Sequence, residues 1–328
     1  MTPNLVCGRP LKVIVKFAVP VLLGTLFQQM YNIVDAIIVG HLIGTDALAA
    51  IGSTAGLSFF FVGFVNGVCS GFSIAVSQYY GAGDFKGMRK CVMNAFYLTI
   101  GLAAAITALS VAMSPLLLHV MNTPEDIYGD AYIYIVTIYW GIPCTFLFNF
   151  LLGVMRALGD SRSALYFLIF SSCMNIVLDL LFVMALNAKV FGVALATVLA
   201  QGITAGICYI YIKRSFPVLK LQKNDVALDI RKIQDLCELG IPIGLQFSIT
   251  AIGSNVLQAA LNSLGSVYVA ASSVASKVHG LVQSPFDSIG VAAATFSGQN
   301  LGAGENERIV RGFKANMLIS LGYSVFSF

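Results

Sequence analysis

The residues best suited to chemistry are two acids inside long apolar segments. Asp179 is the only charged residue in SSCMNIVLDLLFVM (171–184), and Asp35 lies in a second such segment. Asn175 precedes Asp179 by four residues, so their side chains share one face of a helix. A carboxylate in hydrocarbon costs several kcal/mol, a cost that folding alone does not require. We interpret both acids as holders of a cation or proton; the alternative for Asp179 is a structural polar contact between helices.

The composition places these acids in a membrane protein. The chain has 328 residues, of which 58% are hydrophobic and 10% are charged, whereas soluble domains contain about 25% charged residues. Its charge-free segments have the length of a membrane helix, about 20 apolar residues, and lack the short alternation of barrel strands. We therefore predict an all-α polytopic membrane protein. The seven cysteines form no CxxC motif, and no basic run alternates with aromatic residues, so neither a metal centre nor nucleic-acid binding is indicated.

The distribution of basic residues predicts the topology. Of the 19 Lys and Arg, 17 lie at the N-terminus and in every second loop, Lys189 lies alone on the other side, and Lys277 lies within a span. Cytoplasmic loops carry the excess of Lys and Arg. We expect a multi-pass protein of the plasma (inner) membrane with a cytoplasmic N-terminus.

Polar residues also form a stripe on the first predicted span. They stand at positions i, i+3, i+4 and i+7, a spacing that faces a cavity or a partner helix rather than lipid. Lys277 and Asp287 are ten residues apart, so they do not pair on one helix. Either could line a central cavity; the alternatives are snorkelling and a contact with helices that the second half of the chain lacks. The candidates for a substrate cavity are Gln28, Tyr31, Asn32, Gln246, Lys277 and Asp287.

The chain repeats itself after six predicted spans. An even number of spans restores the same orientation, so the two copies are parallel, an arrangement found in transporters. The prolines align at an offset of 222 residues and the glycine turns at 221. The aligned segments are FAVPVLLGTLF (17–27) with LGIPIGLQFSI (239–249) and VSQYYGAGD (76–84) with FSGQNLGAGE (296–305), which place Pro20 over Pro242, Gln78 over Gln299 and Gly81 over Gly302.

This repeat divides the chain into three predicted parts. Residues 1–215 form an N-lobe of six transmembrane helices, 216–228 a cytoplasmic linker, and 229–328 a partial C-lobe of about three helices, which gives about nine in all. The residue aligned with Asp35 is Val256 or Leu257, neither of which ionises. The coupling acids are therefore expected in the first half only.

The same segments resemble the multidrug and toxic compound extrusion (MATE) family of cation-coupled exporters. The resemblance covers most of the chain and rests on Pro20 with YNIVDAIIVG (31–40), GAGD (81–84), RALGDSRSAL (156–165), NIVLD (175–179) and GVALAT (192–197). The family fold has twelve helices in two parallel six-helix lobes that form a V. The resemblance therefore implies a second lobe that is incomplete, C-terminally truncated by three helices.

The resemblance also implies a coupling site in the first lobe. The coupling ion is H⁺ or Na⁺, with no cofactor and no other metal. Tyr132 and Tyr139 compete with Tyr134 for the matching position, and ordinary interhelical hydrogen bonding is the alternative role for Asn175 and Thr197. The implied residues are Asp35, Tyr134, Asn175, Asp179 and Thr197, of which all but Tyr134 would hold Na⁺.

A family member of this kind is an antiporter, not an enzyme. It exports amphiphilic, often cationic drugs and toxic compounds by alternating access, and we expect it to act as a monomer in contact with membrane lipid. One alternative is a flippase of the same superfamily that moves lipid-linked saccharides, although the first lobe here offers acids rather than cations. An intramembrane enzyme and a channel are disfavoured, because the chain has no HExxH, GxSxG or DDxxD pattern and no filter-like loop.

Overall fold

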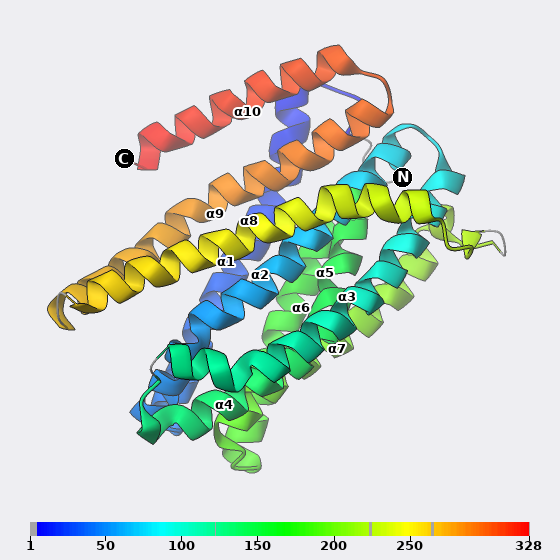
Figure 1. Ribbon diagram of the computed structural model, residues 1–328. Coiled ribbons are helices and arrows are strands. Elements are labelled where there is room, and N and C mark those ends of the chain that lie inside the picture. Colours follow the sequence, from blue (N-terminus) through cyan, green and yellow to red (C-terminus); the bar gives the residue numbers. More distant parts are fainter. Residues whose placement is uncertain (1–4, 122, 223–224, 264–265, 328) are drawn as a thin grey trace.

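The computed structural model describes residues 5–121, 123–222, 225–263 and 266–327 (Figure 1); its description of side chains excludes 258–259, 261–271, 273–274 and 277. The described chain is helical and contains no strand, which confirms the all-α prediction. A π-helical turn (Leu181–Ala185) follows α6, and a 3-10 turn (Pro217–Leu219) follows α7. The ten α-helices of the described ranges are α1 (Pro10–Leu42), α2 (Thr45–Gly81), α3 (Phe85–Val120), α4 (Glu125–Trp140), α5 (Ile142–Ala157), α6 (Ser161–Leu180), α7 (Lys189–Ser215), α8 (Ile230–Ser263), α9 (Ser266–Gly302) and α10 (Asn306–Ser327).

Six helices within the described residues are long and apolar enough to cross a membrane. They are α1, α2, α3, α6 with its π turn, α7 and α8. The pair α4–α5 makes a seventh span if it counts as one, because its axis bends by 47°. Pro143 lies in the first turn of α5, where its ring prevents a continuous helix. The count of about nine spans stays a prediction.

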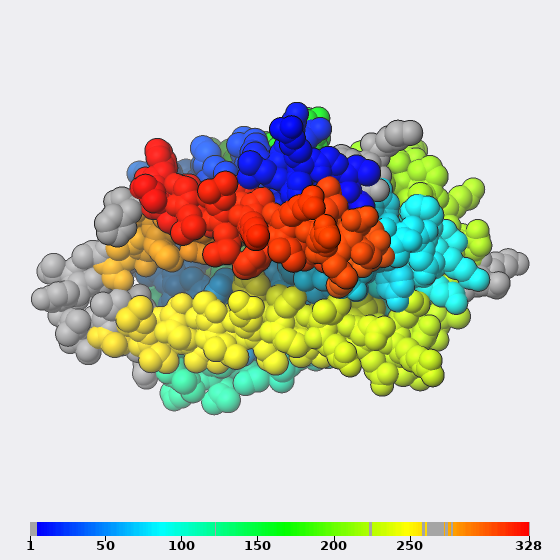
Figure 2. All heavy atoms as spheres, turned by 90° about the horizontal axis from the view of Figure 1, so that it is seen from above, coloured from blue at the N-terminus to red at the C-terminus, as the bar shows by residue number. Residues whose placement is uncertain are grey.

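The main apolar core lies mostly in the first half of the chain, between α2, α3, α4, α5, α6 and α7, and Leu236 of α8 joins it. Tyr139 is fully buried there; its hydroxyl donates to the carbonyl of Leu57 (3.3 Å), and its ring meets the edge of Phe61. Buried tyrosines ordinarily find such a partner. α8, α9 and α10 pack along one side of this bundle, mainly against α1 and α2. Viewed from above, α8 runs beside α9 and α10, with a furrow between them (Figure 2).

Glycines bring the two halves into backbone contact. A Cβ on Gly67 would lie 2.6 Å from Gly244 Cα, so α2 and α8 touch without intervening side chains. At the crossing of α2 and α9, a Cβ on Gly81 would collide with the carbonyl of Gln299, and one on Gly302 would collide with the carbonyl of Gln78. Small residues permit such close approach of helices. At the crossing of α2 and α9 the contact is reciprocal, because each glycine meets the glutamine carbonyl of the other helix, and the sequence repeat aligns both the glycines and the glutamines.

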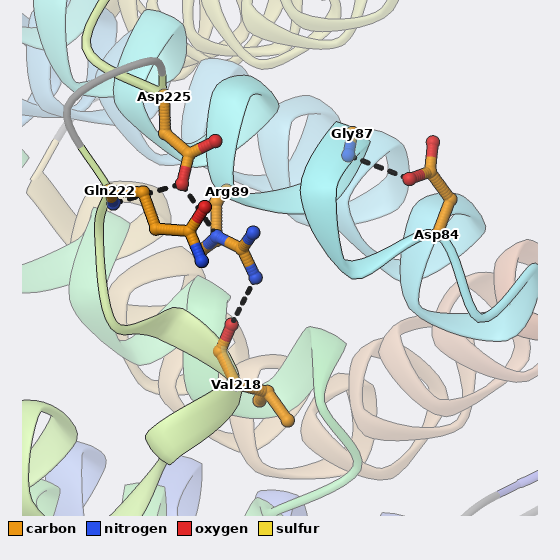
Figure 3. Close-up of polar contacts among 6 residues, drawn as sticks. All are labelled: Asp84, Gly87, Arg89, Val218, Gln222 and Asp225. Carbon is orange, nitrogen blue, oxygen red and sulfur yellow. Dashed lines mark hydrogen bonds and ion pairs between the residues drawn. The ribbon is translucent and has the colours of Figure 1, made fainter.

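The segment between α7 and α8 is bound to α3 (Figure 3). Asp225 is fully buried and accepts from Arg89 Nε (2.6 Å) and from the N–H of Gln222 (3.0 Å). The Asn94 amide accepts from the N–H of Asp229 (2.9 Å), and its nitrogen is 3.4 Å from the carbonyl of Ala227. Burial alone would raise the pKa of Asp225, but the hydrogen bonds from Arg89 and Gln222 outweigh it and lower that pKa. The linker is therefore attached to the first half of the chain.

We expect Asp225→Asn to lower the melting temperature at neutral pH by a few degrees, since it removes a buried charge-assisted hydrogen bond. A carboxyl group with a lowered pKa in the folded state stabilises the fold above its unfolded pKa, and this stabilisation disappears as the pH falls through the folded pKa. Melting curves of the two proteins should therefore converge in acid. A difference that persists undiminished at the lowest pH at which both proteins fold would contradict this account. Asp229, whose side chain binds only the N–H groups of Arg231 and Lys232 in the described structure, provides the matched control Asp229→Asn.

Candidate functional site

Helix α6 presents three polar side chains on one face. Ser171, Asn175 and Asp179 follow one another at four-residue intervals and are 8%, 3% and 0% exposed. Immediately beyond Asp179 the helix widens into the π turn, where the N–H of Leu186 binds the carbonyl of Leu181 (3.3 Å), five residues back. Such turns occur frequently at functional sites. The acid thus lies fully buried at the point where the regular helix ends.

Asn175 links α6 to α7. With the amide oxygen turned toward α7, it accepts from the N–H (3.2 Å) and hydroxyl (3.3 Å) of Thr197, and the amide nitrogen donates to Asp179 Oδ2 (3.3 Å). The opposite orientation would direct the amide oxygen at a carboxylate. Thr197 also lies 3.2 Å from the carbonyl of Val193 in its own helix. The chain Thr197–Asn175–Asp179 therefore holds one carboxylate oxygen in place, while Asp179 Oδ1 has no partner within the described residues.

Asp35 of α1 completes the acidic pair. It is partly buried, and its carboxyl group lies close enough to that of Asp179 for the two to interact directly. An ionised carboxylate only accepts hydrogen bonds, so a bond between these two groups requires a proton on one of them. Two ionised carboxylates at this range repel each other strongly in a medium of low dielectric constant. The geometry is therefore suited to holding one cation or proton between α1 and α6.

Two tyrosines lie beside this pair. Tyr31 of α1 and Tyr134 of α4 are both close enough to interact electrostatically with Asp35 and Asp179. Tyr134 packs against an apolar cluster at the ends of α1 and α7. The competing tyrosines lie elsewhere: Tyr132 stacks on Tyr128, and Tyr139 belongs to the main core. Of the three tyrosines weighed from the sequence, Tyr134 is the one placed beside the acids.

A cavity of about 20 Å³ adjoins the site, enough for about one water molecule. Gln28, Tyr31, Asn175 and Thr197 all line it, together with Gln201 of α7 and two serines of α6. Gln201 accepts from the hydroxyl of Thr145 (2.5 Å), which ties α7 to α5. Neither Gln201 nor the serines is among the predicted site residues. The signal that identifies them is helical spacing: Gln201 lies four residues after Thr197, and the two serines lie four and three residues before Asn175.

The remaining substrate-cavity candidates do not gather at this site. Asn32 is exposed on α1, and Gln246 is exposed on α8. Asp287 is exposed on α9, where its carboxylate accepts from the side chain of Gln283 (3.1 Å). The side chain of Lys277 lies outside the described residues. Their role as cavity-lining residues therefore stays a prediction.

A bundle of membrane-length helices that brings two acids together is typical of one class of protein, the polytopic membrane transporters. The chain belongs to the MatE family, whose profile matches residues 20–181 and again 242–328. The two matches begin at Pro20 and Pro242, the prolines that the sequence repeat aligns. Proteins of this family and the structural neighbours of the chain are transporters rather than enzymes.

Known proteins similar to this chain carry matching descriptions. A probable multidrug resistance protein, YpnP of Bacillus subtilis, is 30% identical over 92% of this chain and 67% of its own length. YoeA of the same organism, also a probable multidrug resistance protein, is 28% identical over 89% of the chain and 65% of its own. The structure of a MOP superfamily transporter from Pyrococcus furiosus superposes with a TM-score of 0.91 over 98% of this chain and 72% of its own, at 23% identity. The chain spans about two thirds of the length of these curated relatives.

Proposed function

We propose that the protein is a cation-coupled antiporter that exports amphiphilic, often cationic compounds across the plasma membrane by alternating access. The pair Asp35–Asp179, in which Asn175 and Thr197 hold Asp179, carries this proposal. The names of the curated relatives support the substrate class, because they are described as probable multidrug resistance proteins. The protein would act as a monomer in lipid, with its N-terminus in the cytoplasm.

The mechanism that we infer starts from the repulsion between the two carboxylates. When no cation is bound, two negative charges at close range favour any movement that separates α1 from α6. A proton or Na⁺ from outside would bind between them and favour the arrangement in which α1 packs on α6, the one described above. The cation can drive the cycle only through its different affinity for the two arrangements. Substrate release outward would follow from the movement of α1, and return of the cation to the cytoplasm would complete the cycle.

Helix α1 is well placed to transmit this movement. It packs against α6 of the first half and against α9 and α10 of the second. Thr25 of α1 lies 3.4 Å from the hydroxyl of Ser288 in α9. Pro20 removes one backbone hydrogen bond from α1 and favours a bend there. A shift of α1 at Asp35 therefore reaches both proposed lobes, of which the second would begin after the linker at 216–228.

The experiment that tests this function measures dye transport in sealed vesicles carrying the purified protein. We expect efflux of a fluorescent amphiphilic cation when a pH or Na⁺ gradient is imposed, and no efflux above that of protein-free vesicles without a gradient. Separate gradients of H⁺ and Na⁺ at a fixed membrane potential identify the coupling ion. Transport at the same rate with and without either gradient would overturn the antiport proposal.

A further inference from the structure

The reciprocal crossing of α2 and α9 allows the surroundings of Gln78 and Gln299 to be compared position by position. α1 and α8 correspond at an offset of 222 residues, and α2 and α9 at 221. Helix α1 of the first half packs on α9 of the second, and its counterpart α8 of the second half packs on α2 of the first. Figure 2 shows the end of α2 and the start of α3 between the α9–α10 turn and the linker. Each side of the crossing thus has an equivalent on the other side.

Beside Gln299 the space is filled by the N-terminal segment. Leu5 is 2% exposed; its N–H donates to Gln299 Oε1 (3.0 Å), and its carbonyl accepts from Arg308 Nη2 (3.1 Å). Leu5 shares a buried apolar cluster with the Phe296 ring. Gln299 also donates to the carbonyl of Ala157 (2.7 Å), so the oxygen and the nitrogen of its amide each have a partner. One aliphatic side chain, one peptide group and one aromatic ring occupy this side of the crossing.

Beside Gln78 the equivalent space is a cavity of about 320 Å³. Ala75 stands where the other half has Phe296, so the aromatic ring is missing. The linker, which corresponds to the N-terminal segment, does not enter, because its residues 225–229 are bound along α3 by Arg89, Asn94 and Tyr97. The cavity beside Gln78 therefore lacks equivalents of both groups that fill the space beside Gln299, the Leu5 segment and the Phe296 ring.

The lining of this cavity is amphiphilic. Its buried part is apolar, formed by Ala75, Cys91 and Leu236, which are 4%, 1% and 1% exposed. Its outer part carries one cation and one anion, Lys232 and Asp235. The Lys232 ammonium donates to the hydroxyl of Tyr79 (2.7 Å) and lies 4.1 Å from the centre of that ring. With opposite charges at the mouth, the site favours a ligand without net charge.

We propose that this cavity binds a small neutral molecule that combines an apolar group, aromatic or branched aliphatic, with an amide. The apolar group would take the place that Leu5 and Phe296 fill in the other half, and the amide would bind the side chain of Gln78 as the Leu5 peptide binds Gln299. The volume lies at the lower end of the range for small-molecule sites, about 300–1,000 Å³. A bound molecule would contact α2 and α3 on one side and α8 and α9 on the other, so it would stabilise the contact between the halves. This binding does not depend on the proposed transport cycle.

The test uses the purified protein in lipid nanodiscs and N-benzoyl-leucine methylamide, which carries a ring, an isobutyl group and amides. We expect saturable binding in equilibrium dialysis and a rise in melting temperature with probe concentration. Ala75→Phe places in the cavity the ring that the second half already contains, so it should weaken probe binding at least about tenfold. Ala104→Phe, an equal change at an exposed position of α3, should leave binding unchanged.

Two results would overturn the proposal: no saturable binding to the unmodified protein, or equal binding by Ala75→Phe and the unmodified protein, which would indicate partition into lipid. If Ala75→Phe fails to fold, Gln78→Leu replaces it. That variant leaves the cavity open and removes the amide partner, so binding should weaken severalfold. Unchanged binding by Gln78→Leu would overturn the role of the amide, and with it the ligand class proposed here.

Discussion

Asp35→Asn should abolish gradient-driven efflux while leaving the protein folded. The neutral amide has nearly the shape of a protonated carboxyl group, so it removes the repulsion with Asp179 permanently and mimics the cation-bound arrangement. A site that no longer changes its affinity between two states cannot be driven by the gradient. We expect the gradient-dependent component of dye efflux to fall at least about tenfold, within the range of typical coupling energies. Melting temperature should stay equal or rise.

Asp179→Asn should have much the same effect, and the double variant should be no worse than either single one. Non-additivity is expected because the two residues share one ion. Asp126→Asn, an exposed acid in the first turn of α4, provides the matched control and should transport normally. Full gradient-driven efflux by Asp35→Asn would refute the shared-ion mechanism.

The geometry of this site was largely predictable from the sequence. An acid inside an apolar helix is costly enough to need partners, and the spacing of Asn175 and Asp179 fixes their common face. Asp35 stood out in the same way, the resemblance to known exporters added Tyr134 and Thr197, and the structure brings all five side chains together. Their role in coupling remains a prediction. Gln201 shares a helix face with Thr197, but its hydrogen bond with Thr145 could not be predicted, because Thr145 lies on another helix and meets it only in three dimensions.

Contacts between distant segments were the part that the sequence could not provide. The segment 216–228 has the composition of a polar linker, yet Arg89 and Asn94 bind its end to α3 through contacts between residues more than 130 positions apart in the chain. The burial of Leu5 against Gln299 has no local pattern at all, since it depends on how α9 passes the N-terminus. The repeat aligned Gly81 with Gly302, but only the structure shows that Gly81 packs against Gln299 of the second half and Gly302 against Gln78 of the first.

That reciprocal contact leads to the second large effect. Gly81→Ala and Gly302→Ala should each lower the melting temperature, because the added methyl group meets a backbone carbonyl of the facing helix rather than a movable side chain. Overpacking of this kind typically costs about 1–3 kcal/mol. It outweighs the gain of at most about 1 kcal/mol that alanine offers over glycine in a helix. Gly101→Ala, in α3 with nothing within 4 Å of the new Cβ, is the matched control and should be neutral or stabilising.

The double variant separates a shared crossing from two independent strains. Both glycines lie where α2 crosses α9, so the displacement caused by one methyl group makes room for the other. The loss of stability in the double variant should therefore be clearly smaller than the two single losses combined, as expected for coupled neighbours. Thermal melts of all four variants in one detergent provide the comparison. If the two single losses of stability simply add in the double variant, each methyl group strains the chain separately. The inference that the two halves pack reciprocally at this crossing would then be wrong.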